Sequence, residues 1–187
     1  MFERFTKDAR AVVQEASRHA EQAGARSVDA GHLLLALLDR EASRASFALA
    51  ALGLEKHRES VRRELAEARR RAGLTRADAE ALAGLGIDVS EIVSRVEQAH
   101  GPGAMSADRK GGVPSPGRRP FSRGAKEILQ GALRAAVGRR DRRIGDEHLL
   151  LALTARPGVP AEILADHGVT YASVTRVLYG GTGTQAG

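Results

Sequence analysis

The 187-residue chain has no cysteine and no tryptophan, and aromatic residues make up only 3% of it. The absence of cysteine excludes disulfide bonds, thiol catalysis and thiolate metal sites, and it suits a reducing compartment, so we expect a cytoplasmic protein. A membrane span needs about 18 consecutive apolar residues, and no apolar run in this sequence comes near that length. Residues 1–5 also lack the apolar run of a signal peptide. We therefore expect no membrane contact.

Sequence motifs that mark common enzymes are missing too. The glycine-rich segment 180–183 lacks the lysine and the following helix of a phosphate-binding loop, and no serine lies in a Gly-x-Ser-x-Gly turn. No pair of histidines has the spacing of a zinc-hydrolase helix. Asp146 and Glu147 are adjacent, so on a helix they diverge instead of facing one substrate. We therefore expect a protein that is not an enzyme, with no catalytic residue, no metal site and no cofactor.

The net charge of +6 is unevenly distributed. Residues 1–100 hold 16 basic and 16 acidic side chains, whereas residues 101–187 hold 13 and 7. Most of the excess lies in one arginine-rich segment, which contains Arg118, Arg119, Arg123, Arg139, Arg140, Arg142 and Arg143. Such a segment is typical either of a solvated helix face or of a surface that binds nucleic acid. The scarcity of aromatic residues and the lack of a helix-turn-helix pattern make nucleic acid the weaker alternative.

One segment occurs twice. His-Leu-Leu-Leu-Ala-Leu at 32–37 returns unchanged at 148–153, 116 positions later, and the same offset aligns 5–10 with 121–126. Self-similarity in two separated blocks indicates a duplicated structural unit. The repeated histidine opens a leucine-rich helix in each unit, so we interpret it as a structural residue that hydrogen-bonds near the helix start.

The apolar residues recur at helical spacing and show no β-strand alternation, which predicts an all-α fold of two pseudo-symmetric helical units. In the first unit Thr6 is the expected cap of a helix over 7–23, Asp29 the cap of the leucine-rich helix, and further helices are expected near 47–52 and over 55–72. In the second unit Ser122 is expected to cap the first helix, and the last helix should end near Tyr179.

The first unit looks enlarged by two extra helices, one capped by Thr75 and ending at Gly84, the other starting at Asp88 or Ser90. The segment that follows is rich in glycine, proline, serine and arginine, as in flexible linkers. The expected organisation is a first unit with its helical extension over 1–100, a linker over 101–119, a second unit over 120–180 and a disordered tail over 181–187.

These residues resemble a known family. Met-Phe-Glu-Arg-Phe-Thr at 1–6, Phe-Ser-Arg-Gly-Ala-Lys at 121–126 and Gly-Asp-Glu-His-Leu-Leu-Leu-Ala-Leu at 145–153 are similar to the repeat signatures of the Clp N-terminal domain, the double-repeat helical module of ClpA- and ClpC-type unfoldases. The resemblance covers 1–65 and 120–180, and ATPase modules are absent from the sequence. It implies a module that binds Clp protease components, adaptors or substrate proteins.

The resemblance also implies a ligand, because in the ClpC branch each repeat can hold a phosphorylated arginine. A threonine that opens the first helix helps to bind the phosphate, and a glutamate just before the histidine meets the guanidinium. The second repeat keeps both elements as Ser122 and Glu147, whereas the first keeps Thr6 but has Gly31 in place of the glutamate. Simple N-capping by Thr6 and Ser122, with Glu147 as a first-turn charge, is the alternative interpretation.

Three phenylalanines, Phe2, Phe5 and Phe121, stand at the starts of the repeats. They either line an apolar groove for a peptide or anchor the core of each unit. The leading hypothesis is therefore a stand-alone, non-catalytic Clp-type module that binds peptides, substrates or adaptors. Such a module either delivers them to a Clp unfoldase or competes with the N-terminal domain of that unfoldase. A basic protein associated with nucleic acid is the second.

Overall fold

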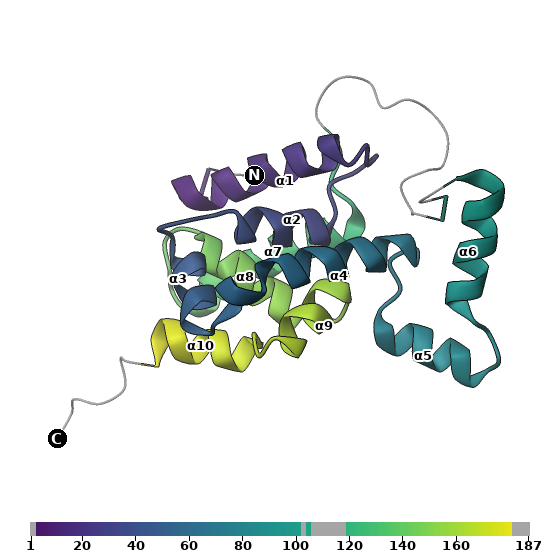
Figure 1. The fold of residues 1–187 in the computed structure, drawn as a ribbon. Coiled ribbons are helices and arrows are strands. Elements are labelled where there is room, and N and C mark those ends of the chain that lie inside the picture. Colours follow the sequence, from purple (N-terminus) through teal and green to yellow (C-terminus); the bar gives the residue numbers. More distant parts are fainter. Residues whose placement is uncertain (1–2, 102–103, 106–118, 181–187) are drawn as a thin grey trace.

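The structure is a computed structural model, which describes residues 3–101, 104–105 and 119–180 (Figure 1). In these ranges the chain forms helices and two single-pair β-bridges but no strand, so the all-α prediction is confirmed. Most of the expected linker over 101–119 and the whole of the expected tail over 181–187 lie outside the described residues. None of the described helices combines the length and the apolar composition that crossing a membrane requires.

The first unit starts with two capped helices. The side chain of Thr6 accepts a hydrogen bond from the N–H of Ala9 (3.2 Å). Asp29 accepts one from the N–H of His32 (2.8 Å), and Nδ1 of His32 accepts one from the N–H of Asp29 (3.1 Å). Both caps were predicted. The elements are α1 (Lys7–Gln22), α2 (Ala30–Leu38), α3 (Arg44–Ala51), the 3₁₀ turn η1 (Leu54–His57) and α4 (Arg58–Arg70).

The predicted helix over 55–72 is thus divided. Its first residues form η1, and α-helical geometry begins only at Arg58. His57, which precedes α4, makes no capping hydrogen bond with its side chain. The second unit follows the prediction, with Ser122 accepting a hydrogen bond from the N–H of Ala125 (3.1 Å) at the start of its first helix. Its helices are α7 (Arg123–Gly138), α8 (Asp146–Ala155), α9 (Val159–Asp166) and α10 (Tyr171–Tyr179).

The two units exchange backbone hydrogen bonds. The N–H of Thr6 donates to the carbonyl oxygen of Ile144, and the N–H of Ser122 donates to that of Val28, both at 2.9 Å. The amides of Ile144 and Val28 donate back, at 2.8 and 2.9 Å, to the residues two positions before Thr6 and Ser122. All these positions are equivalent at the offset of 116. The first helix of each unit therefore starts beside the leucine-rich helix of the other unit.

The leucine-rich helices α2 and α8 lie at the centre of the core and contact each other. Eight of their leucines are at most 1% exposed: Leu33, Leu34, Leu37, Leu38, Leu149, Leu150, Leu151 and Leu153. Side chains of both units belong to one continuous apolar cluster. The interpretation of the repeated leucines as core residues is confirmed, and the duplication produces one shared core.

The two extra helices, α5 (Arg76–Gly84) and α6 (Val89–His100), project from this body beyond the end of α4 (Figure 1). We call them the α5–α6 hairpin. Polar contacts attach it, since Glu162 accepts hydrogen bonds from the N–H groups of Arg76 (2.8 Å) and Ala77 (3.1 Å). Helix α5 has no buried residue, and the buried valines of α6 are not members of the central cluster.

Replacing Asp29 with alanine removes the cap of α2, so we expect the free energy of unfolding to fall by about 1 kcal/mol near neutral pH. Burial raises the pKa of the Asp29 carboxyl, but hydrogen bonding from His32 and the charge of Arg69 outweigh it and bring that pKa to about 2, from 3.8. The carboxylate therefore stabilises the fold above the unfolded pKa and loses this contribution as the pH falls towards the folded one.

Urea denaturation followed by circular dichroism should accordingly show the difference between wild type and Asp29→Ala shrinking as the pH is lowered towards 2. The control is Asp88→Ala, which removes the cap of α6 outside the central core and should change global unfolding less. A loss for Asp29→Ala that is the same at every pH would contradict this account.

Candidate functional site

A polar pocket of about 350 Å³ lies where the start of α1 meets the start of α8. We call it the Thr6 pocket. Its lining combines three arginines with four carboxylates, a threonine and a histidine: Thr6, Asp8, Arg44, Asp141, Arg142, Arg143, Asp146, Glu147 and His148. The exchanged backbone hydrogen bonds create it, because they hold Thr6 of the first unit beside Ile144, three residues before Glu147.

Glu147 is the buried acid of this pocket, with a side chain only 6% exposed. Nη1 of Arg44 donates a hydrogen bond to its Oε1 at 2.8 Å. Its carboxylate folds back over Gly145, where any side chain would overlap it. Burial raises the pKa of the Glu147 carboxyl above its ordinary value, and Arg44 and His148 only partly offset this.

Arg44 is a residue of this pocket that the sequence did not reveal. It stands at the start of α3, 103 positions from Glu147, and it lies 5.3 Å from the ring centroid of Tyr179. Asp146 binds the same helix, since its carboxylate accepts a hydrogen bond from the N–H of Ala45 (3.2 Å). The pocket is thus fixed by contacts between helices that are distant in sequence.

The two repeated histidines have the structural geometry expected of them. Nδ1 of His148 accepts a hydrogen bond from the N–H of Gly145 (2.9 Å), as Nδ1 of His32 does from Asp29. The units differ at the other ring nitrogen. Nε2 of His148 lies 3.0 Å from a carboxylate oxygen of Asp141, whereas Nε2 of His32 is buried and has no hydrogen-bond partner among the described residues.

Ser122 and Glu147, which the resemblance pairs within the second repeat, line different pockets. Ser122 lines a separate pocket of about 260 Å³ together with Gly31, which we call the Gly31 pocket. Nη2 of Arg69 lies 3.3 Å from the position that a Cβ on Gly31 would occupy. The exchange between the units explains this arrangement, because it places Thr6 with Glu147 and Ser122 with Gly31.

Phe5 and Phe121, the two candidate phenylalanines that the structure describes, do not line an open groove. Phe5 is 4% exposed and belongs to the core, and Phe121 is partly buried and packs against the same core. Both also pair in the β-bridges, Phe5 with Ile144 and Phe121 with Val28. Phe2 lies outside the described residues.

One group of metal-ligating types exists among the described residues. Ligand atoms of Glu15, His19 and Asp39 all lie within 4.8 Å of one another, and Nε2 of His19 is 2.6 Å from a carboxylate oxygen of Asp39. Both carboxylates are also paired with arginines, Glu15 with Arg18 and Asp39 with Arg62. We interpret the group as an ion-pair cluster that closes the surface between α1 and α2.

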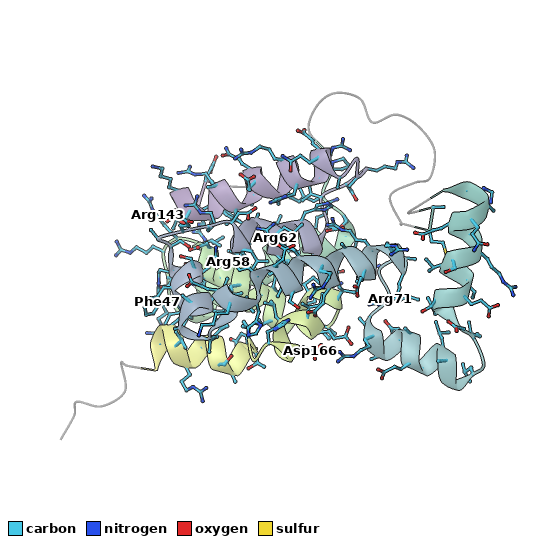
Figure 2. The ribbon with its side chains drawn as sticks, viewed as in Figure 1. Phe47, Arg58, Arg62, Arg71, Arg143 and Asp166 are labelled. Atoms are coloured by element: carbon cyan, nitrogen blue, oxygen red, sulfur yellow. The ribbon has the colours of Figure 1, made fainter. Side chains whose placement is uncertain are left out.

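The arginine-rich segment is divided among several contacts. Arg123 pairs with Glu127 (3.0 Å), and the guanidinium of Arg139 lies 3.1 Å from the ring centroid of Tyr179. Arg142 and Arg143 line the Thr6 pocket, and Figure 2 shows Arg143 at one end of the molecule. Arg118 lies outside the described residues. Part of the basic charge is therefore a wall of this pocket.

The chain belongs to the Clp repeat N-terminal domain family, whose model matches residues 4–76 and 120–186. The matched ranges contain both units, and residues 77–119 between them, which include most of the α5–α6 hairpin, are not matched. This domain is a non-catalytic binding module.

Solved structures agree in fold. The N-terminal domain of the caseinolytic protease associated chaperone ClpD from Arabidopsis thaliana is 19% identical, with a TM-score of 0.52 over 95% of this chain and 94% of that one. The Hsp104 N-terminal domain from Candida albicans is 18% identical, with a TM-score of 0.50 over 98% and 94%. At these identities the likeness concerns the fold alone.

Replacing Glu147 with glutamine removes a titrating group and keeps its size. A buried acid with a raised pKa stabilises the fold when protonated, so its contribution is present at acidic pH and lost as the pH rises through the raised pKa. We therefore expect the stability of Glu147→Gln relative to wild type to improve between acidic and neutral pH. The free energy of unfolding measured across that range checks this, with the exposed Glu59→Gln as control. A difference that moves the opposite way would refute it.

Proposed function

We propose that this protein binds substrate or adaptor proteins of the Clp system without catalysing a reaction, in the reducing cytoplasm that a cysteine-free chain suits. We further propose that the Thr6 pocket takes a phosphorylated arginine side chain. The observation that carries this proposal is the hydrogen bond between Arg44 and Glu147, because the pocket already holds one guanidinium against a buried carboxylate.

The two halves of such a ligand need opposite chemistry. Glu147 offers a carboxylate to a guanidinium, and bonds of this type are strong because both partners are charged. A phosphate is favoured by the N-terminus of α1, which Thr6 opens, and by the positive charges of Arg142 and Arg143 in the same pocket. Both requirements meet within one cavity of about 350 Å³.

Arg44 competes with the ligand in this proposal. Its side chain is 52% exposed, so it can leave Glu147 at small cost when another guanidinium arrives. The Gly31 pocket lacks a counterpart of Glu147, and Arg69 lies beside the place where that side chain would stand. The carboxylate that does line this pocket, Asp29, is the cap of α2 and accepts a hydrogen bond from Arg69 (3.4 Å). We therefore assign phosphoarginine binding to the Thr6 pocket alone, with Ser122 acting as a helix cap.

Titration with free phosphoarginine, followed by amide chemical shifts, tests the narrower proposal. Glu147→Gln should weaken binding by on the order of tenfold or more, since it removes a charge-assisted hydrogen bond. Arg44→Ala should strengthen binding by freeing the carboxylate. Unmodified arginine should bind more weakly than phosphoarginine.

The sharpest control comes from the pseudo-symmetry. Thr6→Ala and Ser122→Ala each remove the cap of a first helix, at a similar cost in stability, but only Thr6 shares a pocket with Glu147. Thr6→Ala should weaken binding and Ser122→Ala should leave it unchanged. Equal effects of the two variants would exclude the Thr6 pocket as the site.

Capture of partners tests the broader proposal separately. The wild-type protein, immobilised at low salt in a lysate of its host, should retain Clp components, their adaptors or client proteins. Retention of none would contradict Clp binding. Retention without phosphoarginine affinity would leave the broader function standing and remove only the narrower one.

A further inference from the structure

Most of the large apolar side chains that stay exposed on the described part of the chain belong to two parts of the fold. One part is the α5–α6 hairpin, and the other is the pair of helices α7 and α10 of the second unit. The first group is Leu85, Ile87 and Ile92, the second is Leu133, Val137 and Tyr171, and Phe47 of α3 stands apart. Exposed apolar groups of this kind mark interaction surfaces.

The α5–α6 hairpin repeats the α9–α10 pair at an offset of 82 positions. Ala-Glu-x-Leu-Ala at 79–83 returns at 161–165, and the glycine three residues later has a φ of +79° at 86 and +76° at 168. The helices keep the same register, because α5 ends at 84 and α9 at 166, and α6 begins at 89 and α10 at 171. The α5–α6 hairpin is thus a repeat of the α9–α10 helix pair, which packs on the core.

Burial separates the two versions. Val169 and Val174 of the second unit are 0% exposed, whereas Ile87 and Ile92 at the equivalent positions are 40% and 42% exposed. Helix pair α9–α10 covers α8 and also contacts α3 and α4. Ile87 and Ile92 keep the apolar character of Val169 and Val174 but have no core beneath them, so these two side chains lack the surface that their counterparts cover.

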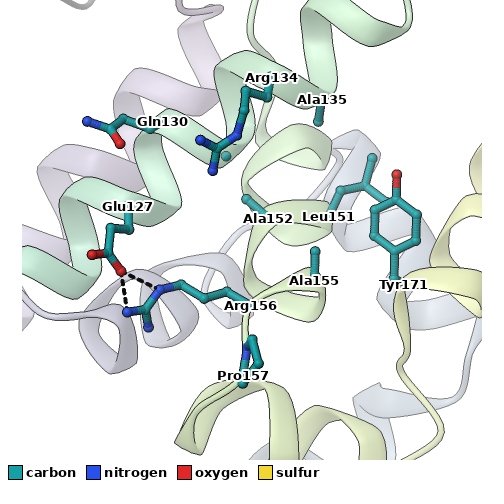
Figure 3. A pocket seen from close by; sticks show the side chains of 11 residues that line it. Glu127, Gln130, Arg134, Ala135, Leu151, Ala152, Ala155, Arg156, Pro157 and Tyr171 are labelled. Carbon is teal, nitrogen blue, oxygen red and sulfur yellow. Dashed lines mark hydrogen bonds and ion pairs between the residues drawn. The ribbon is translucent and has the colours of Figure 1, made fainter.

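A groove between α7 and α8 offers an apolar surface of the right kind (Figure 3). This α7–α8 groove has a volume of about 570 Å³. The exposed apolar side chains in its lining are Ala155, Pro157 and, at one end, Tyr171. In the first unit the equivalent space is filled by Glu15, His19 and Asp39. At the same three positions the second unit has Gly131, Ala135 and Ala155, which leave the groove open.

Charge complementarity indicates which segment occupies the α7–α8 groove. The hairpin holds five acidic residues and two arginines over 76–100, a net charge of −3 in a chain of net charge +6. In the groove Arg156 is paired with Glu127 (2.8 Å), and Arg134 has no acidic partner among the described residues, so the lining is positive (Figure 3). Helix α7 adds further basic side chains and only one acidic residue. An acidic apolar hairpin is complementary to this groove in both charge and polarity.

We propose that the α5–α6 hairpin of one copy lies in the α7–α8 groove of a second copy, reciprocally, so that the protein is a two-fold dimer. Two-fold closure uses both hairpins and both grooves and leaves no complementary surface free. This inference goes beyond the proposed function. The groove adjoins the C-terminal end of α8, whereas the Thr6 pocket adjoins its N-terminal end, so dimerisation leaves that pocket accessible.

Sedimentation equilibrium of the full-length protein over a range of concentrations tests the dimer. We expect a mass that rises to twice 19.8 kDa, and a dissociation constant that increases with salt because opposite charges are screened. A monomer at every concentration and at low salt would overturn the proposal, whatever the protein captures from a lysate.

Variants identify the two surfaces. Leu85→Asp with Ile92→Asp on the hairpin, and Ala155→Asp in the groove, are each expected to raise the dissociation constant on the order of tenfold or more. All three positions are exposed, so the fold should persist. The matched control is Phe47→Asp on α3, which is 62% exposed at the end of the molecule away from the hairpin (Figure 2) and should leave the dimer intact.

Mixing the hairpin variant with the groove variant gives the decisive result. The intact hairpin of one can enter the intact groove of the other, so the mixture should form heterodimers more readily than either variant forms homodimers. Failure of the mixture to associate would overturn the hairpin-in-groove contact in favour of pairing between like surfaces. Weakening by Phe47→Asp equal to that of the hairpin variant would overturn it as well.

Discussion

Exchanged backbone hydrogen bonds between the two units are the constraint on which the rest of the structure depends. They bind the residue that caps α1 to the segment before α8, and the residue that caps α7 to the segment before α2. Buried backbone donors and acceptors require partners, and here those partners lie in the other unit. The position of both pockets follows, because each combines the first helix of one unit with the leucine-rich helix of the other.

Much of the fold could be predicted from the sequence, because helical periodicity and capping are local properties. Thr6, Asp29 and Ser122 cap the expected helices, and the repeated leucines are buried as expected. The residue at which α4 starts could not be predicted, because the sequence pattern does not distinguish a 3₁₀ turn from the first turn of an α-helix. The exposure of Ile87 and Ile92 also could not be predicted, because an apolar helical pattern does not tell whether a core exists to receive it.

Only part of the candidate site could be predicted from the sequence. Glu147 and Thr6 were singled out by resemblance, but the structure combines them across the units, and no local signal links positions 6 and 147. Arg44 gave no signal at all, since its partner is 103 positions away. Repeat alignment identifies equivalent residues, but it does not tell which copy supplies the neighbour.

The two units retain equivalent cores and differ in the chemistry around them. Close packing restricts the volume of buried side chains, so the leucines of α2 and α8 recur, whereas residues at the periphery can change freely. Gly31 replaces the counterpart of Glu147, and an ion-pair cluster at Glu15, His19 and Asp39 stands where the second unit is hollow. A duplicated scaffold has thereby acquired distinct surfaces without altering its interior.

The same exchange governs how the chain can fold during its synthesis. A nascent chain that has emerged only as far as residue 100 contains Thr6 but not Ile144, so the amide before α1 has no partner and α2 has no second leucine-rich helix to pack against. Bonds that join residues so far apart in sequence form late, because a long loop must close before they are gained. Helices α1, α3 and α4 can pack on α2 as soon as they are made, but the face of α2 that contacts α8 stays uncovered until the second unit has been synthesised.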